Sequence, residues 1–475
     1  MELNVTSKLN GPLRATVVDT AGHARPVWVL LFAVASIVSL FTAPQSQVAP
    51  SAANSSGIAL VGGTLIDGRG GKPFRDSVVL IRDRRIEAVG TVESTPVPAG
   101  YQRVSTEGMS VLPGLWDMHT HLQYSGSTDL GGWNTKYLPQ MESVIMPAVA
   151  QQLLMAGVTS ARDPMAPLDP ILHVRDKIAR GEIPGPTLYV AGALLEHSPP
   201  PGVESFRWGV SGAADAKAKV DQLANKGVNL IKLLCVNDMT QEEATAVVQQ
   251  AHARGLKVAA HGRADDEIRK CLKAGVDDFQ HLGTQGLLPD DIVAGIRERV
   301  RERPLYWTPT VGNPINNMYL RDNAEMLDDV AWQRGLPPSI VEDVRTSLKQ
   351  LPAILNRVQM LVPSSVETYK RKFYQVREAG AELLVGTDTG NPGHFHPYAT
   401  WLELDAWVNH FGVEPMDAIR RATAIPAQVM GVQRDYGTLE VGKYADVIVV
   451  AGDPLRHIDL LRNPVVVIKH GRQVK

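Results

Sequence analysis

SVLPGLWDMHTH, residues 110–121, is the first of eight short apolar runs that have the composition of buried β-strands. The other seven follow along the chain: GVTSARDP (157–164), PTLYVAGA (186–193), NLIKLLCV (229–236), KVAAHGR (257–263), DDFQHLG (277–283), LYWTPTV (305–311) and ELLVGTDTG (382–390). Most runs are followed by a helical pattern, as in TQEEATAVVQQAHARGL, which opens with a threonine cap and closes at a glycine.

Strand-like and helix-like stretches alternate in this way over residues 114–435. Eight such units predict an α/β fold of the (β/α)₈ TIM barrel type, with room for insertions. The rival fold is a doubly wound parallel sheet, which carries a glycine-rich phosphate-binding fingerprint after its first strand. No such fingerprint follows residues 110–121, so the barrel is favoured.

Short β-rich runs with glycine and aspartate turns flank the barrel on both sides. They include ALVGGTLIDG and SVVLIRD before it, and GTLEVGKYADVIVVAG and PVVVIKHGRQV after it. We expect residues 57–113 and 436–475 to form one small discontinuous β-sandwich domain. Residues 311–365 are longer than a normal βα connection, and we interpret them as a helical lid over the barrel.

Val27–Ala43 is an uninterrupted apolar run near the N-terminus. Basic residues precede it, and a stretch rich in proline, serine and alanine follows it. This order is typical of a secretory signal, and about 17 apolar residues is also the short limit for crossing a bilayer. We interpret residues 1–50 as an export signal or an uncleaved anchor with a linker, and a buried core helix is the alternative.

The composition limits what the protein does. The 475 residues are 44% hydrophobic, which suffices for one large core and a smaller domain. Lys and Arg number 48 against 50 Asp and Glu, so the chain lacks the basic excess of a general nucleic-acid binder. Its two cysteines, Cys235 and Cys271, cannot form a disulfide framework, and we expect both to be buried thiols.

Six ionisable residues lie at strand ends of the predicted barrel. His119 and His121 are two positions apart, so their side chains project to the same side of the first strand. The other four end other runs: Lys232, His261, His281 and Asp388. A barrel gathers such strand ends at its C-terminal face, where the active sites of this fold lie.

Each of these residues alone has a structural explanation, since a strand histidine is often a hydrogen-bonded core residue. A lysine in an apolar strand is different, because burying an unpaired ammonium is costly. Four histidines, a lysine and an aspartate at the ends of five strands together indicate a metal site. Imidazole and carboxylate ligands without thiolates favour a divalent cation such as Zn²⁺, Mn²⁺ or Fe²⁺.

The same residues carry a resemblance to a known family. LPGLWDMHTHL, the lysine of NLIKLL, the histidines of VAAHG and FQHLG, the aspartate of VGTDTG and the later GTLEVGKYADVIVV resemble the amidohydrolase superfamily. The resemblance is strongest to its imidazolonepropionase-like and prolidase-like branch, and it covers nearly all of the chain after residue 57. It implies a metal-dependent hydrolase acting on carbon–nitrogen bonds.

The resemblance also implies a binuclear site in which every ligand position is filled. His119 and His121 match the ligands of the more buried ion, and Asp388 completes that site. His261 and His281 match the ligands of the more exposed ion. Lys232 matches a lysine that is carboxylated on its amine and bridges both ions, which are expected to be zinc. A metal-bridging hydroxide would attack the substrate, and Asp388 would pass its proton to the leaving group.

Two comparisons within the superfamily limit which reaction we expect this chain to catalyse. Deaminases carry a glutamate three residues after the strand-five histidine and lack the bridging lysine, whereas this chain has Ala264 at that place and keeps Lys232. Imidazolonepropionase opens a cyclic amide with one metal, so the filled lysine position argues against that exact reaction. Hydrolysis of an amide is therefore favoured over loss of ammonia from a ring.

Two residues are candidates for substrate binding. Arg263 lies two positions after His261, and a guanidinium there suits a carboxylate on the substrate. The structural alternative is that Arg263 pairs with Asp265 or Asp266. His394 lies in the loop TGNPGHFHPY after the eighth strand, where it would face the site, although glycine and proline also fit a structural turn.

The favoured function is hydrolysis of an amide in a dipeptide, an N-acyl amino acid or a related xenobiotic. The alternatives are a lactonase or cyclic-amide hydrolase with the same binuclear site, and a non-catalytic exported binding protein. We expect a small-molecule substrate with or without a carboxylate, no nucleic-acid partner, and contact with a membrane only through the N-terminal segment. The expected location is outside the cytoplasm, and a homo-oligomer is left open.

Overall fold

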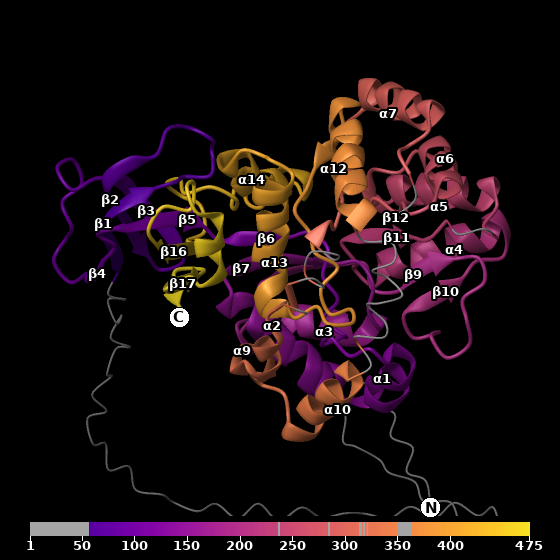
Figure 1. Ribbon diagram of the computed structural model, residues 1–475, viewed down its shortest axis with the longest axis horizontal. Coiled ribbons are helices and arrows are strands. Elements are labelled where there is room, and N and C mark those ends of the chain that lie inside the picture. Colours follow the sequence, from indigo (N-terminus) through magenta and orange to yellow (C-terminus); the bar gives the residue numbers. More distant parts are fainter. Residues whose placement is uncertain are drawn as a thin grey trace, which may run out of the picture. The chain divides into compact units, whose positions relative to one another are not determined.

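The computed structural model describes residues 57–235, 238–283, 286–312, 316, 319–320, 322–349, 351 and 363–475 (Figure 1). The apolar run Val27–Ala43, interpreted above as an export signal, lies outside these residues. Within them, no helix is both long enough and apolar enough to cross a bilayer. The described chain from Gly57 onward belongs to one compact unit.

The predicted (β/α)₈ barrel is confirmed, and each of the eight apolar runs contains one of its parallel strands. These strands are β6 (Leu115–Asp117), β7 (Val158–Asp163), β8 (Thr187–Val190), β11 (Leu230–Leu233), β12 (Lys257–His261), β13 (Asp278–Gln280), β14 (Tyr306–Thr308) and β15 (Glu382–Leu383). The first three form one sheet, and the other five form a second sheet with β9 (Leu194–Glu196) and β10 (Arg207–Gly209).

Backbone hydrogen bonds join the two sheets at both of their junctions. Asn229 donates its N–H to Val190 O at 2.8 Å, which links β8 to the start of β11. Met118 donates to Val385 O at 3.0 Å, and Asp388 donates to His119 O at 2.7 Å. These two bonds lie just beyond β6 and β15, so the first and last barrel strands run side by side where the predicted ligands lie.

Helices follow the strands and cover the outside of the barrel. They are α1 (Leu130–Tyr137), α2 (Met146–Met155), α3 (Leu168–Ala179), α4 (Gly212–Asn225), α5 (Gln241–Ala253), α6 (Asp265–Ala274), α7 (Asp290–Glu302), α12 (Pro363–Glu378), α13 (His396–Asp405), α14 (Pro415–Arg421) and α15 (Ala424–Val429). The largest apolar cluster lies between strands and helices, where Phe279 and Trp307 pack with ring centroids 4.6 Å apart. Burial of this surface stabilises the barrel.

An eight-stranded sheet is built from both ends of the described chain. Its strands are β1 (Ile58–Leu65), β2 (Phe74–Arg82), β3 (Arg85–Thr91), β4 (Gln102–Ser105), β5 (Met109–Pro113), β16 (Val447–Ala451), β17 (Val466–Lys469) and β18 (Arg472–Gln473). The antiparallel pairing of β5 with β16, with Leu112 opposite Ile448, joins the two ends. The discontinuous β domain is therefore observed, while the domain limits given above stay a prediction.

The segment interpreted as a lid is helical where the structure describes it. It contains a 3₁₀ turn at Ala324–Asp328 and the helices α9 (Val330–Gln333) and α10 (Pro338–Leu348). The Trp332 ring stacks on the Phe395 ring, which precedes α13, with centroids 4.7 Å apart. Thr128 Oγ1, just before α1, donates to Ser347 O at 2.6 Å. The segment thus packs on the helices around the first and last strands, and its role as a lid stays a prediction.

The expectation that both cysteines are thiols is wrong. Cys235 and Cys271 are buried, as expected, but they form a disulfide with Cα atoms 6.8 Å apart. Cys235 follows β11 and Cys271 lies on α6, which follows β12. Because β11 and β12 pair directly, the two βα units are neighbours and bring the sulfurs together.

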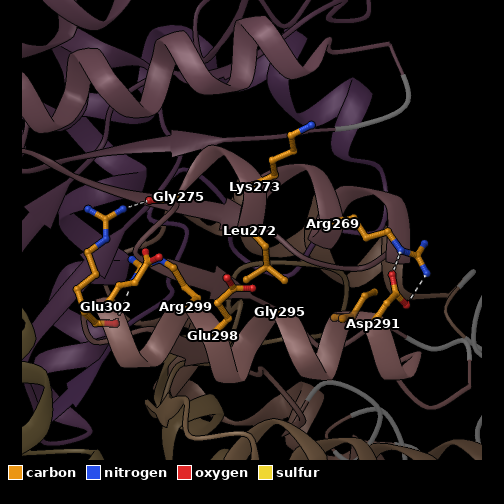
Figure 2. Close-up of a pocket in the computed structure, with 11 residues that line it drawn as sticks. Arg269, Leu272, Lys273, Gly275, Asp291, Gly295, Glu298, Arg299 and Glu302 are labelled. Carbon is orange, nitrogen blue, oxygen red and sulfur yellow. Dashed lines mark hydrogen bonds and ion pairs between the residues drawn. The ribbon is translucent and has the colours of Figure 1, made fainter.

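A charged hollow lies between α6 and α7 on the outside of the barrel (Figure 2). Its arginine side chains already have partners within the fold. Arg269 Nε donates to Asp291 Oδ2 at 2.6 Å, and Arg303 Nη2 donates to the carbonyl of Gly275, the residue that ends α6. This hollow is therefore best explained as packing between two helices, and the candidate site lies at the barrel mouth.

Candidate metal centre

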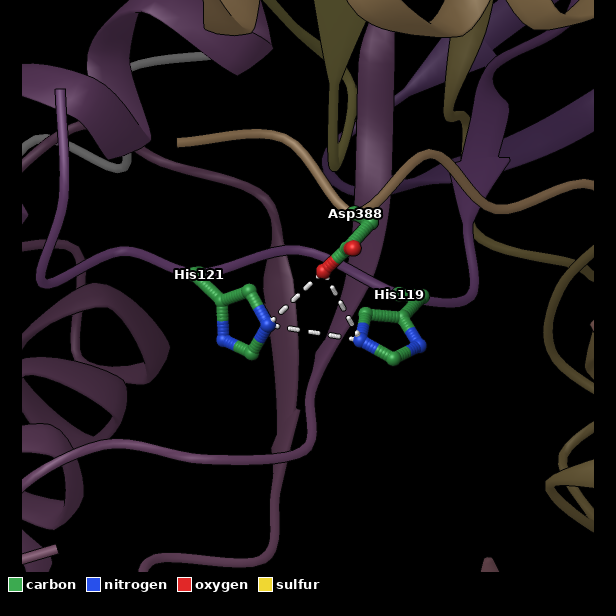
Figure 3. Close-up of side chains that lie close together, drawn as sticks. All are labelled: His119, His121 and Asp388. Atoms are coloured by element: carbon green, nitrogen blue, oxygen red, sulfur yellow. Dashed lines mark hydrogen bonds and ion pairs between the residues drawn. The ribbon is translucent and has the colours of Figure 1, made fainter. Parts of the chain in front are cut away.

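Three ligand atoms converge beyond the ends of the first and last barrel strands (Figure 3). His119 and His121 follow β6, and Asp388 follows β15. Asp388 Oδ1 lies 3.0 Å from His121 Nε2 and 3.3 Å from His119 Nε2, and the two nitrogens are 3.3 Å apart. All three side chains are buried, so solvent does not screen their charges.

The protonation of His119 and Asp388 suits a cation. Burial lowers the pKa of His119 to about 3, so its imidazole is neutral at pH 7. Burial alone would raise the pKa of Asp388, but the surrounding histidines outweigh burial and hold that pKa well below its usual value. His121 Nδ1 lies 3.3 Å from Met165 O, an acceptor that directs its Nε2 toward Asp388. Imidazole nitrogens and a carboxylate oxygen at one point fit a divalent metal ion.

The two remaining histidines lie beside this cluster. His261 is the last residue of β12, and His281 directly follows β13. Their ring centroids are 4.5 Å apart, and the His281 centroid is 4.8 Å from that of His119. His281 Nδ1 is 3.8 Å from Asp388 Oδ2. Burial lowers the pKa of both rings well below the usual value, so both are neutral ligand candidates.

Lys232 lies on β11 and is buried, with 3% of its surface exposed. Its Nζ has no hydrogen-bond partner among the described residues. Burial lowers the pKa of Lys232 to about 7, although the charges of Asp388 and Asp278 act in the opposite direction. An unpartnered amine in such a position is costly. The structure therefore places all six predicted residues at one end of the barrel and leaves this amine in need of a partner.

Backbone strain concentrates at the same place. Among the described residues, six that are not glycine have a positive φ, and three of them are His281 (70°), Thr310 (49°) and Asp388 (61°). Thr310 Oγ1 lies 2.8 Å from His281 Nδ1. Non-glycine residues in this conformation cost free energy and tend to occur at functional sites. Here the strained positions aim two of the candidate ligands.

Sequence reasoning missed Asp117, which holds the two strand ends together. Its Oδ1 accepts the backbone N–H of His119 and of Thr387, both at 3.1 Å. Its Oδ2 accepts the hydroxyls of Thr387 at 2.7 Å and of Thr400 at 3.0 Å. Burial raises the pKa of Asp117 to about 6. Its position two residues before His119, on the same side of the strand, was the available signal.

Arg263 lies at the edge of the cluster, with its side chain 54% exposed. Its Nη2 is 3.4 Å from Asp388 Oδ2. Asp266, one of the acids offered as a structural partner, instead accepts from Arg269 Nη1 at 2.9 Å. Arg263 thus faces both the site and solvent, and its role toward a substrate stays a prediction.

The loop after β15 is bound to the ligand segment. His394 is buried, and its backbone carbonyl accepts the N–H of Gly390 at 3.0 Å. His396 Nε2 donates to His121 O at 3.2 Å, and burial lowers the pKa of His396 to about 3. These contacts show the structural role of the loop, while substrate binding by His394 stays a prediction.

Comparisons with known proteins point to one family. Residues 110–474 match the model of the Amidohydrolase family. An imidazolonepropionase of Streptomyces coelicolor is 24% identical over 399 residues, covering 82% of this chain and 88% of that protein. A putative prolidase from Bifidobacterium longum has a TM-score of 0.65 and 27% identity, covering 88% of this chain and 94% of that one. A Xaa-Pro dipeptidase with bound methionine has a TM-score of 0.67 and 24% identity, covering 88% and 100%.

The family match spans more than half of the sequence and includes the segments that carry all the candidate ligands. It shows that the chain belongs to the amidohydrolase family and is a metal-binding hydrolase of carbon–nitrogen bonds.

Proposed function

We propose that this hydrolase cleaves an amide bond in a dipeptide or an N-acyl amino acid at a site for two divalent metal ions, which we take to be zinc. The observation that carries the proposal is the buried, unpartnered amine of Lys232 beside two pairs of histidines. The likeness to a putative prolidase supports a peptide-like amide. The imidazolonepropionase relatives support a cyclic amide as the second candidate.

The proposed ligand roles follow from where the side chains lie. His119, His121 and Asp388 would hold one ion, His261 and His281 the other, and Lys232 would serve both. When bound, such ions lower the pKa of a coordinated water and polarise a carbonyl. The protein's own side chains would carry out the remaining steps.

Lys232 would serve both ions only in a modified form. A neutral amine adds CO₂, so that a carbon–nitrogen bond forms and one proton leaves the nitrogen for solvent. The product is an anionic carbamate, which supplies oxygen ligands where the unmodified side chain offers a single nitrogen. Burial already favours the neutral amine of Lys232, whose pKa is about 7.

Asp388 is the proposed carrier of the proton. Its Oδ1 faces the two histidines after β6, while its Oδ2 faces Arg263 and His281. The carboxylate would accept a proton from the attacking water and deliver it to the nitrogen that leaves. Arg263, exposed at the mouth, would bind a carboxylate on the substrate through charge-assisted hydrogen bonds.

We also propose that the protein is exported. The buried disulfide between Cys235 and Cys271 supports this location, because such bonds form and persist in oxidising compartments and are rare in the cytosol. It is a source of support independent of the apolar run Val27–Ala43.

The first prediction concerns activity and metal content. The purified protein should hydrolyse N-acyl amino acids or dipeptides, lose this activity with a chelator, and contain about two ions per chain by elemental analysis. His281→Ala should lower the metal content, whereas His173→Ala, at an exposed histidine beside Glu142, should not. Faster turnover of lactones or imidazolones would favour the alternative substrates, and no hydrolysis of any of them by metal-loaded protein would indicate a binding protein.

The second prediction concerns Lys232. Lys232→Ala should bind zinc about 10–100-fold more weakly, as expected when a group that holds a metal is lost. A short-chain carboxylic acid or bicarbonate should restore part of the activity by supplying the missing oxygens. Lys217→Ala, an exposed lysine on α4, is the matched control. Metal-loaded protein prepared in ¹³C-bicarbonate should show a carbamate signal by NMR, and its absence would refute carboxylation.

The third prediction concerns Arg263. Its contact with a substrate carboxylate should contribute roughly 1.5–3 kcal/mol, so Arg263→Ala should lower kcat/KM about 10- to 100-fold for substrates that carry a carboxylate. Neutral amides should change little. Arg269→Ala, an arginine paired with Asp291 on the outside of the barrel, should leave both substrate classes unaffected. Equal losses on charged and neutral substrates would instead assign Arg263 a structural role.

The fourth prediction concerns location. Cell fractionation should find the protein outside the cytoplasm or held at the membrane, and the unfolded, unreduced protein should titrate with no free thiol. A full-length, untrimmed chain in the soluble cytoplasm with two free thiols would contradict export.

A further inference from the structure

Gln280 makes two hydrogen bonds that sequence reasoning did not anticipate. It is the last residue of β13 and is fully buried. Its Oε1 lies 2.5 Å from His119 Nδ1, and its Nε2 donates to Asp278 Oδ2 at 2.7 Å. One amide therefore bridges a candidate metal ligand and a buried carboxylate.

Asp278 decides which way the amide of Gln280 points. With its oxygen and nitrogen exchanged, the amide would set its oxygen 2.7 Å from a carboxylate oxygen, and two acceptors would face each other. Asp278 Oδ2 also accepts from Arg162 Nη2, and a guanidinium offers only donors, so this oxygen acts as an acceptor. Both of these side chains are buried, so the amide has one favourable orientation.

Arg162 ties this arrangement to the strand that carries His119. It lies on β7, which pairs with β6, and its Nε donates to the backbone oxygen of Met118 at 2.7 Å. Its Nη2 also donates to Thr308 Oγ1 on β14 at 3.1 Å. A single guanidinium therefore fixes the backbone before His119 and the carboxylate that orients Gln280.

The orientation of the Gln280 amide determines the tautomer of His119. With the Gln280 oxygen facing Nδ1, that nitrogen carries the proton and donates it. Nε2 then carries the lone pair, and Nε2 is the atom that faces His121 and Asp388. The opposite tautomer would place a proton where a metal ion has to bind.

We propose that Gln280, oriented by Asp278 and Arg162, is a positioning residue that fixes the Nδ1–H tautomer of His119 and thereby sets the zinc affinity of the site. The inference rests on the proposed function, because it takes His119 as a metal ligand. Outer partners of ligating histidines typically contribute 10–100-fold in metal affinity.

The test compares zinc dissociation constants of metal-free, full-length protein, measured by competition with a colorimetric chelator at one pH. Gln280→Leu removes the acceptor and should weaken zinc binding 10–100-fold. Gln280→Met, which has similar length and no amide oxygen, replaces the leucine variant if that variant does not fold.

Gln152→Leu is the matched control. Gln152 is also buried and donates to two backbone oxygens, of Trp332 at 2.7 Å and of Arg334 at 2.8 Å, but it lies on α2, away from the ligands. Its loss should lower the thermal midpoint of the metal-free protein and leave zinc affinity unchanged. If the role of Gln280 were purely structural, Gln280→Leu would likewise lower the thermal midpoint and leave zinc affinity unchanged.

The possible outcomes separate the inference from the proposed function. Zinc binding by Gln280→Leu or Gln280→Met that equals that of the unsubstituted protein would overturn the inference and leave the metal site intact. Unsubstituted protein that binds no zinc would overturn both.

Discussion

The carboxylate of Asp117 is the contact on which the geometry of the site depends. It accepts hydrogen bonds from the backbone of His119 and from the backbone and hydroxyl of Thr387, so it holds the segment after β6 against the segment after β15. These segments carry His119 and His121 on one side and Asp388 on the other. Because four donors converge on one buried carboxylate, each oxygen accepts two of them and the group is fully used.

The same junction explains why the site lies where the barrel closes. Parallel strands of two residues, such as β15, supply little pairing by themselves. The bonds from Met118 to Val385 and from Asp388 to His119 O extend the pairing past the strand end. The positive φ of Asp388 then turns its side chain toward the histidines. Closure of the barrel and the geometry of the ligand set thus depend on the same contacts, and the surrounding hydrogen bonds hold the local strain.

The sequence predicted the barrel and the six-residue set because both depend on local patterns. Five of the eight apolar runs carry a candidate ligand near their ends, and parallel strands gather such ends on one face. Local patterns did not predict the residues that form hydrogen bonds with the ligands or with their backbone. Gln280 lies 161 residues from His119, and Asp117 lies 270 residues from Thr387, so only the folded chain shows that they meet.

The prediction for the two cysteines was wrong for the same reason. Cys235 and Cys271 are 36 residues apart, and their pairing depends on the adjacency of two βα units. Composition indicated that two cysteines cannot form a framework, which says nothing about a single bond. The short strands β9 and β10 were also missed.

The loop that carries Arg263 and the loop that carries His281 are joined to each other and to α12. The buried ammonium of Lys372 donates to Leu282 O at 3.0 Å and to Gly283 O at 3.4 Å, directly after His281. Gly283 has φ of 65°, and a Cβ there would overlap the carbonyl oxygen of Arg263, so only glycine allows the two loops to touch. The loop with a metal ligand and the loop with the candidate substrate arginine therefore form one unit, anchored by a helix that follows the long insertion after β14. A displacement of α12 would therefore shift both loops together and change the position of His281.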